Sequence, residues 1–555
     1  MQSASEKQAL MLRDKIGPWL SHLGLRLHPR RVIAHPSRTW RGLAAALVVG
    51  ALPALAFPAP SWWWLAWFGI VPLLLVVRAA PTARAAALRA CCGMAAYILA
   101  TQYWLLPSAG PLLIVLAIGL GALWLPWGLA AYLLLGDPIT ARATLAAVVV
   151  LPSAWVMAEA VRSWPSLGGP WAPLGASQWN QPATLASASL GGVWLTSFVI
   201  VGANTAIAGV ILHRRVSARV IAAAVALACA GFGPAWFWLA PAPPAASTVR
   251  VALVQPGNLQ DSLARQAAGE ALTAALAGQR LDLVVWGESS VGVDLASQPE
   301  AMTRLAELSR RVGADLLVNV DARDRTGGIY KSSVLIGPNG SRGAYSKTRL
   351  VPFGEYVPLR PLLGWATRHT KAAAEDRRRG SGQVVLHTGR PAGSDPGMLI
   401  GGLAIGPLIS FEATFSDLPR QEVQRGAELL VYQSSTSTFQ GTWAQPQLAS
   451  QAAVHAAEVG HSAVHTGLSG VSAAFDARGQ QLAWYAATER GAIVVDVPLE
   501  SHTTAFQRLG NWVLGLAFAI LAGAIVVVTL RSRRLHLLAV GRQLTKWYGR
   551  SVRRS

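Results

Sequence analysis

At 555 residues, the chain is too long for one ordinary domain, and with 52% apolar and only 14% charged residues it is too apolar for two soluble domains. Between Gly42 and Pro241 the only acidic residues are Asp137 and Glu159. The net charge of +21 could point to nucleic acid, but Lys and Arg lie at the edges of apolar segments, and no nucleic-acid-binding motif occurs. The composition therefore predicts a membrane protein without a nucleic-acid partner.

The first 41 residues are polar and basic, and we expect residues 1–41 to form a separate N-terminal segment. Apolar runs of the length that crosses a bilayer follow it. They lie at about 43–58, 62–78, 88–106, 111–135, 143–160, 188–212 and 219–240, with a last one at about 511–530. This pattern predicts a membrane domain of about seven helices at 42–241 and a C-terminal transmembrane helix within 506–555.

Basic residues predict the orientation of these spans. Loops with Arg78, Arg142 and Arg214 alternate with nearly uncharged turns at 59–61 and 107–110, so the positive-inside rule places the N-terminus in the cytoplasm. The tail after Leu530 carries eight cations and no acid, which indicates a cytoplasmic C-terminus. Residues 242–505 should then form an extracytoplasmic domain of a multi-pass protein of the cell membrane.

Residues 242–505 alternate strand and helix patterns, which predicts a layered α/β fold. We expect strands at 249–254, 281–286, 315–320, 332–336, 399–409 and 428–432, and helices at 262–279, 298–313, 415–426 and 442–459. The stretch from about 362 to 396 has little periodicity, so we expect a long loop over or beside a site. Its Pro361, Leu362, Leu363 and Trp365 could dip into lipid headgroups, and Arg377 to Arg379 could meet phosphates; an ordinary solvated loop is the alternative.

Three polar residues follow three predicted strands. Glu288 comes after Leu-Asp-Leu-Val-Val-Trp-Gly, Lys347 after a short strand, and Ser410 after Ile-Gly-Pro-Leu-Ile. A carboxylate, an ammonium and a hydroxyl supply the base, the oxyanion stabiliser and the nucleophile that acyl transfer needs. His455, His461 and His465 match no tetrahedral metal framework, so we expect no metal and no cofactor.

The segment Tyr345-Ser-Lys-Thr-Arg-Leu-Val-Pro-Phe-Gly-Glu-Tyr-Val-Pro358, together with Trp286-Gly-Glu288 and Ile409-Ser-Phe-Glu412, resembles the nitrilase superfamily. Members of that superfamily use a Glu, Lys and Cys triad on an αββα sandwich. With the predicted spans on both sides, the resemblance narrows to the apolipoprotein N-acyltransferase family and covers nearly the whole chain. It implies a multi-span helical membrane domain joined to an αββα sandwich.

The resemblance also implies residue roles. Glu288 would be the general base, Lys347 would stabilise the oxyanion, and Ser410 would occupy the nucleophile position. Glu355 looks like an additional essential carboxylate, and Glu412 would anchor the turn beside the nucleophile. For these last two residues a purely structural role, as a salt bridge or cap, is an equal alternative.

Two departures from the family pattern stand out. Ser410 replaces the family's Cys, and a hydroxyl is far less acidic than a thiol, whose pKa is about 8.5. The stretch Ser435-Thr-Ser-Thr-Phe-Gln440 replaces an Asn-Asp-Ala-Trp-Phe-Gly stretch, and His455 lies near a family arginine.

The resemblance implies transfer of an acyl chain from a phospholipid, through a covalent acyl-enzyme, to the N-terminal S-diacylglyceryl-cysteine of a lipoprotein. Glu288, Lys347 and Glu355 favour retained chemistry. Ser410 and the altered 435–440 stretch favour an alternative, an inactive member that binds lipid or lipoprotein or regulates an active paralogue. Amide hydrolysis of the soluble-nitrilase kind is a third possibility, for which the predicted spans have no evident use.

Overall fold

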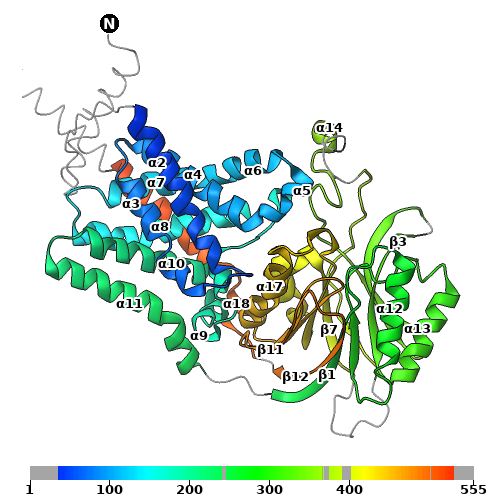
Figure 1. The fold of residues 1–555 in the computed structure, drawn as a ribbon. Helices are drawn as coiled ribbons and strands as arrows, with labels where there is room; N and C mark the ends of the chain where they lie inside the picture. The colour runs from blue at the N-terminus through cyan, green and yellow to red at the C-terminus, as the bar shows by residue number, and fades with distance from the viewer. Residues whose placement is uncertain are drawn as a thin grey trace, which may run out of the picture.

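The structure is a computed structural model, and it describes residues 36–240, 245–324, 326–365, 367, 374–389, 402–500 and 502–530. Most of the predicted N-terminal segment, the basic tail after Leu530 and parts of the loop at 362–396 lie outside the described residues. The described chain has a helical part and a part built from two β-sheets, which lie side by side (Figure 1).

The helical part comprises mostly apolar helices. They are α2 (Pro36–Ala51), α3 (Val71–Arg78), α4 (Ala83–Gln102), α5 (Leu106–Ala109), α6 (Leu112–Gly121), α7 (Leu125–Leu134), α8 (Ala141–Arg162), α9 (Pro182–Leu185), α10 (Ala188–Leu212) and α11 (Val216–Leu239). Short 3₁₀ turns join several of them into longer units. Thr82 and Thr140 cap α4 and α8 by accepting N–H bonds at 3.1 Å from Ala85 and Ala143.

Six helical units in the described part of the chain are long and apolar enough to cross a membrane. They are Ala83–Ala109, Leu112–Leu134, Ala141–Arg162, Ala188–Leu212, Val216–Leu239 and Trp512–Leu530, which match six of the eight predicted runs. The runs at 43–58 and 62–78 fall on two shorter apolar helices, Trp40–Ala56 and Trp63–Arg78. Pro58 and Pro60 lie in the turn between them, and Pro53 lies in the 3₁₀ turn that ends the first helix; proline interrupts a helix because it lacks the N–H that continues it.

The second part is the predicted αββα sandwich. One sheet has the order β12-β1-β2-β3-β4-β5 and the other the order β11-β10-β9-β8-β7-β6. The strands are β1 (Ala245–Gln255), β2 (Leu283–Trp286), β3 (Asp315–Arg323), β4 (Ile329–Gly337), β5 (Gly340–Ser346), β6 (Leu386–His387), β7 (Ala404–Ile409), β8 (Leu429–Ser434), β9 (Ala463–Gly467), β10 (Ser472–Phe475), β11 (Gln481–Tyr485) and β12 (Gly491–Glu500). Alternate side chains of both sheets meet in a dry core between them, as in other sheet-on-sheet packings.

Helices cover the outer face of each sheet. The helices α12 (Ser262–Ala274) and α13 (Pro299–Val312) lie on the face farthest from the helical part, and α16 (Asp417–Gln424) and α17 (Ala444–Val459) belong to the other sheet (Figure 1). Every predicted strand and helix of this region overlaps an element of the structure. The two-residue β6 and the strands after α17 were not among the predicted elements, and β5 was predicted only as a short strand before Lys347.

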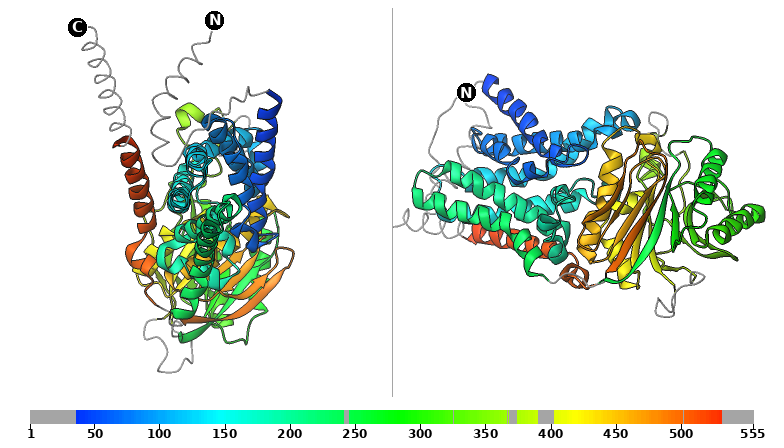
Figure 2. Two further views of the ribbon diagram at one scale, coloured as in Figure 1. Left: turned by 90° about the vertical axis from the view of Figure 1, so that its left-hand side faces the viewer. Right: turned by 60° about the horizontal axis from the view of Figure 1, so that its bottom comes forward.

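The helix α17 joins the sandwich to the helical part. Of its sixteen residues only Pro446 is not buried, because one side packs on the sheet and the other on the membrane helices (Figure 2). One hydrophobic core therefore runs without a break from the membrane helices through α17 to β8 and β9. The short α18 (Ala505–Leu509) then leads into the last helix, which runs back along the helical part (Figure 2).

Gln433, a fully buried residue of β8, connects the two sheets through its side-chain amide. Its Nε2 donates to the carbonyl oxygens of Trp286 at 2.7 Å and Leu317 at 3.1 Å, and its Oε1 accepts from the Ser333 hydroxyl. A buried amide is stable only when its donors and acceptor are paired, and here all three partners belong to the other sheet. This contact fixes how the ends of the two sheets lie relative to each other.

We expect Gln433→Leu to lower the free energy of unfolding by about 2 kcal/mol, because it leaves buried backbone and hydroxyl groups without partners. The thermal unfolding midpoint of the full chain in detergent measures the effect. Gln279→Leu, at an exposed position, is the matched control and should leave the midpoint unchanged. Equal midpoints for the two variants would show that the amide does not hold the sheets together.

Candidate active site

The three residues predicted for acyl transfer each follow a strand, and hydrogen bonds connect the loops that carry them. Glu288 follows β2, and its backbone N–H donates to the carbonyl of Ser434 at the end of β8 (3.1 Å). Lys347 follows β5, and the next residue, Thr348, donates its N–H to Glu412, two residues beyond Ser410 (2.7 Å). The strand ends that carry these groups therefore lie at one end of the sandwich.

A cluster of buried charges forms the centre of this end. Lys331 Nζ lies 2.6 Å from Glu288 Oε1 and 3.5 Å from Glu355 Oε1. Lys347 Nζ lies 2.9 Å from Glu355 Oε1 and 3.6 Å from Glu288 Oε1. Two ammonium groups and two carboxylates thus alternate, so each charge has two opposite charges beside it.

Backbone donors bind the outer oxygens of both carboxylates. Glu288 Oε2 accepts the N–H of Ser435 at 3.1 Å, and Glu355 Oε2 accepts the N–H of Val351 at 2.9 Å. The Lys347 side chain is 1% exposed, whereas that of Lys331 is 12% exposed. Both carboxylates are therefore bound by ammonium groups on one oxygen and by a backbone N–H on the other, and Lys331 is the more accessible of the two cations.

The cluster keeps both carboxylates ionised. Burial would raise the pKa of Glu288, but the ammonium groups of Lys331 and Lys347 outweigh burial and hold that pKa below its ordinary value. Burial acts the same way on Glu355, but Lys347 and Lys331 lower its pKa to about 2. The carboxylates raise the pKa of Lys331 against the effect of its own burial, so this lysine is an ammonium.

A second pair of charges, Asp321 and Arg377, lies beside this cluster. Asp321 on β3 pairs with Arg377 and accepts the Ser289 hydroxyl at 3.0 Å, and its Oδ2 lies 3.7 Å from Lys331 Nζ. For Arg377 the sequence left open a phosphate contact or an ordinary solvated loop; in the structure it lies at the edge of the charge cluster, paired with Asp321. Arg379 stacks on the ring of Tyr356, 5.1 Å from its centroid. The apolar residues Leu359 and Leu362 of the same loop are about 70% exposed.

Ser410 lies at a sharp turn between β7 and a 3₁₀ helix, Ser410–Thr414, with a φ of 53°. A positive φ costs a residue with a Cβ on the order of 1–3 kcal/mol, and such strain gathers at functional sites. Ser289 and Thr436, which adjoin Glu288 and Ser435, also have positive φ angles, of 58° and 51°. Ser410 is half-buried, and its hydroxyl makes no hydrogen bond within the described part of the chain.

Glu412 anchors both the serine turn and the loop after β5 that carries Lys347 and Glu355, called here the lysine loop. Its Oε1 accepts the Tyr345 hydroxyl, the N–H and hydroxyl of Thr348, and the N–H of Arg349, all at 2.7–3.0 Å. Its Oε2 accepts the N–H of Ile409 at 2.9 Å. This fully buried carboxylate therefore fixes the residue before Ser410 relative to the residue after Lys347.

His455 on α17 supports the far side of the serine turn. Its Nε2 lies 2.9 Å from the carbonyl oxygen of Ala413, and its Nδ1 lies 2.7 Å from Glu458 Oε2. Glu458 Oε1 in turn accepts the N–H of Val193 at the kink of α10. His455 is thus a link between the turn and the membrane helices, and no cluster of possible metal ligands occurs among the described residues.

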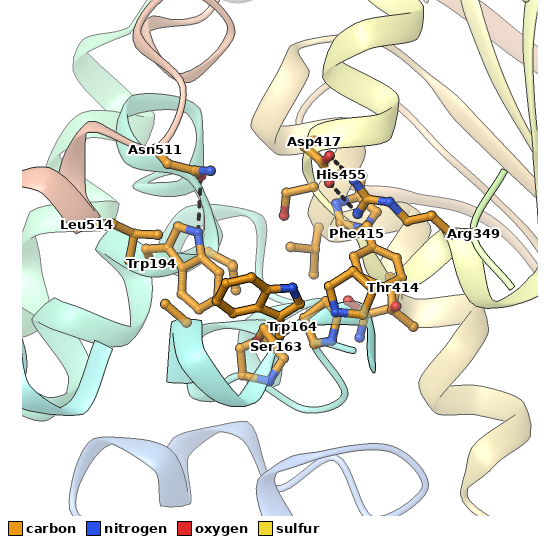
Figure 3. A pocket seen from close by; sticks show the side chains of 18 residues that line it. Ser163, Trp164, Trp194, Arg349, Thr414, Phe415, Asp417, His455, Asn511 and Leu514 are labelled. Carbon is orange, nitrogen blue, oxygen red and sulfur yellow. Dashed lines mark hydrogen bonds and ion pairs between the residues drawn. The ribbon is translucent and has the colours of Figure 1, made fainter. Parts of the chain in front are cut away.

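A cavity of about 290 Å³ lies behind the serine turn, at the junction with the membrane helices (Figure 3). Thr414 and Phe415 from the turn, Trp164 and Trp194 from the helical part, and His455 line it. Arg349 pairs with Asp417 on its wall and lies 4.3 Å from the centroid of the Phe415 ring. The turn that carries Ser410 is therefore enclosed jointly by the sandwich and the membrane helices.

Lys331, Asp321 and Arg377 were not predicted as site residues. A signal for Lys331 exists, because it is two residues before Ser333 on β4 and so shares the strand face that looks toward the other sheet. The strand predicted at 332–336 begins one residue too late to include it. Asp321 lies beyond the predicted end of its strand, and Arg377 lies in a segment without periodicity.

Comparisons with known proteins agree with this architecture. The family model "Apolipoprotein N-acyltransferase N-terminal domain" matches residues 49–206, and the model "Carbon-nitrogen hydrolase" matches residues 250–505. A solved structure of an amidase from Nesterenkonia, of the nitrilase superfamily, is 18% identical and covers 46% of this chain and 94% of its own, with a TM-score of 0.32. A likeness with that TM-score supports no conclusion about the fold or the activity of this chain.

Relatives of full length are more informative. The apolipoprotein N-acyltransferase of Azotobacter vinelandii is 30% identical over 515 residues, which are 88% of this chain and 95% of that protein. The apolipoprotein N-acyltransferase of Geobacter metallireducens is 28% identical over 527 residues, which are 89% of this chain and 96% of that protein. Because a relative 30% identical is matched over most of both chains, and the two family models match the helical part and the sandwich, the chain belongs to the apolipoprotein N-acyltransferase family.

Proposed function

We propose that this protein transfers an acyl chain from a phospholipid to the N-terminal S-diacylglyceryl-cysteine of lipoproteins, with Ser410 as the nucleophile. The observation that carries the proposal is the tie between the serine turn and the charged cluster, since Glu412 binds Ile409 on one side and Thr348, next to Lys347, on the other. An acyl transferase needs its nucleophile, base and cation held in one geometry before substrate arrives.

In the first half-reaction, the Ser410 oxygen attacks the ester carbonyl carbon of the phospholipid, and its proton passes to Glu288. The Lys347 ammonium stabilises the negative charge on the carbonyl oxygen of the tetrahedral intermediate. The bond to the glycerol oxygen breaks, and that oxygen takes the proton from Glu288. The products are a lysophospholipid and an acyl ester on Ser410.

In the second half-reaction, the α-amine of the lipoprotein attacks the acyl ester and gives its proton to Glu288. The intermediate collapses to an amide, and the Ser410 oxygen leaves with that proton. Glu355 positions Lys347 through their 2.9 Å ion pair, and Glu412 keeps the turn in place. Glu288 therefore acts as base and acid in alternation, as general acid–base catalysis requires.

Both substrates are held in a lipid layer by their acyl chains. A protein whose apolar helices lie in the same layer can bind both of them there. We infer that the sandwich faces away from the cytoplasm, because the loops with Arg78, Arg142 and Arg214 follow the positive-inside pattern. The exposed Leu359 and Leu362 beside the lysine loop favour contact with the headgroup layer.

Incubation of the purified full chain with phospholipid should add the mass of an acyl chain to the peptide that contains Ser410, and a diacylglyceryl peptide should then remove it. Ser410→Ala should abolish the adduct. Ser410→Cys should accelerate adduct formation by on the order of 10-fold or more, because a thiol ionises far more readily than a hydroxyl. Peptide mass spectrometry measures each step. No adduct on the native chain, with none on Ser410→Cys, would mean that the protein is a non-catalytic family member.

Glu288→Gln should lower the acylation rate by about 10²–10⁴-fold, the usual contribution of a general base. Lys347→Met should lower it by about 10²–10³-fold, as for loss of an oxyanion donor.

Because Glu288 has a lowered pKa, the acylation rate of the native chain should stay constant from neutral pH into mild acid. It should fall only when the Glu288 carboxylate protonates, below the ordinary pH range for a glutamate. Single-turnover acylation against pH measures this. Full activity of Glu288→Gln would remove Glu288 from the mechanism.

Labelling with a membrane-impermeant maleimide tests the orientation. Arg304→Cys, on an exposed position of α13, should react in intact cells, whereas Arg215→Cys, in the exposed loop before α11, should react only after the membrane is permeabilised. Peptide mass spectrometry separates these positions from the native cysteines. The opposite pattern would place the sandwich in the cytoplasm.

A further inference from the structure

The charge cluster contains one lysine more than the proposed mechanism uses. Lys331 makes the shortest ion pair to Glu288, at 2.6 Å, whereas Lys347 lies 3.6 Å from the same oxygen. Its side chain is almost buried and has three carboxylates within 3.7 Å, those of Glu288, Glu355 and Asp321. A lysine enclosed in this way is part of the site and not a solvated surface cation.

We propose that Lys331 is a positioning residue that holds Glu288 as an ionised carboxylate and sets how strongly Glu288 draws the proton from the nucleophile at position 410. The proposal deepens the proposed function and rests on it for the identity of the reaction. It concerns only the proton transfer in which the hydrogen on the nucleophile passes to Glu288.

Lys331 balances the charges of the cluster. With Lys331 present, two ammonium groups face two carboxylates, and the adjoining pair of Asp321 and Arg377 is neutral by itself. Without Lys331, Glu288 and Glu355 would share the single ammonium of Lys347. Two buried carboxylates with one cation between them cannot both stay ionised at little cost, so one of them would hold a proton at higher pH.

Among the residues that the structure describes, no other cation contacts the Glu288 carboxylate in a way that could replace Lys331. Charged groups near it come from β3 (Asp321), β4 (Lys331) and the lysine loop (Lys347, Glu355), with Arg377 behind Asp321. Within the described part of the chain, the other group that binds its carboxylate is the N–H of Ser435. From α12, Arg265 donates to the backbone carbonyl of Ser289 at 3.1 Å and so faces the chain beside Glu288, not its carboxylate.

The consequence for catalysis has two opposite parts. Lys331 keeps Glu288 unprotonated, and so ready as a base, at lower pH. The same ion pair makes Glu288 a weaker base, because the proton must compete with an ammonium 2.6 Å away. A weak base suits a thiol better than a hydroxyl, so Lys331 is expected to limit the rate at which Ser410 is acylated.

The test uses the full chain with Ser410→Cys and adds either Lys331→Met or Lys331→Arg. Alkylation of position 410 by iodoacetamide, followed by peptide mass spectrometry across pH, reports thiolate formation and needs no acyl transfer. We expect Lys331→Met to raise the pH midpoint of alkylation by about one unit, since a neighbouring cation is lost. Lys331→Arg keeps the charge and should keep the midpoint. Equal midpoints for Met and Arg would overturn the proposal.

A second measurement uses Ser410 itself. Lys331→Met should move the acid side of the acylation profile to higher pH, whereas Lys331→Arg should leave it where the native chain has it. A merely structural role would lower the rate at every pH without moving the profile, and that result would also overturn the proposal. If alkylation shifts as expected while the native chain acylates nothing, the role of Lys331 stands and the proposed function fails.

Discussion

The site depends on the pairing of buried charges at the ends of the two sheets. Lys331 and Lys347 alternate with Glu288 and Glu355, and each carboxylate also accepts a backbone N–H. Burying a single charge would cost several kcal/mol, and only complete pairing makes such a group tolerable. Lys331 on β4 and the residues that follow β2 and β5 meet in these ion pairs, so the geometry of the candidate site and the stability of this region depend on the same contacts.

A second set of contacts connects this cluster to the membrane helices. Glu412 fixes the serine turn to the lysine loop, and His455 binds the carbonyl of Ala413 at the end of the same turn. Through Glu458 the contact continues to Val193, where α10 is kinked at Gly191 and Gly192. The turn that carries Ser410 is thus fixed from the sandwich on one side and from the bilayer-spanning part on the other. This arrangement suits an enzyme whose substrates both arrive from a lipid layer.

Much of the fold was predictable because its signals are local. Apolar runs of spanning length gave six of the membrane helices, and buried strands such as Leu283–Trp286 and Leu429–Ser434 were evident from their Val, Leu and Tyr content. The two shorter helices were overestimated because a hydropathy pattern does not register the backbone break that Pro53, Pro58 and Pro60 cause. Strand β5, with the sequence Gly-Ser-Arg-Gly-Ala-Tyr-Ser, has too little apolar content for its bounds to be predicted, since its pairing with β4 supplies its stability.

Glu288 and Ser410 were candidates because each follows a strong strand, and Lys347, Glu355 and Glu412 because they lie in the segments that carry the family resemblance. Lys331 could not be assigned in the same way, because its partners Glu288 and Glu355 are 43 and 24 positions away and meet it only in the folded sandwich. The most direct test of the account is an experimental structure of the protein after reaction with a long-chain fluorophosphonate. The account predicts a covalent bond from Ser410 Oγ to phosphorus, with the phosphoryl oxygen beside Lys347 Nζ. An unmodified Ser410, or a phosphoryl oxygen directed away from Lys347, would contradict it.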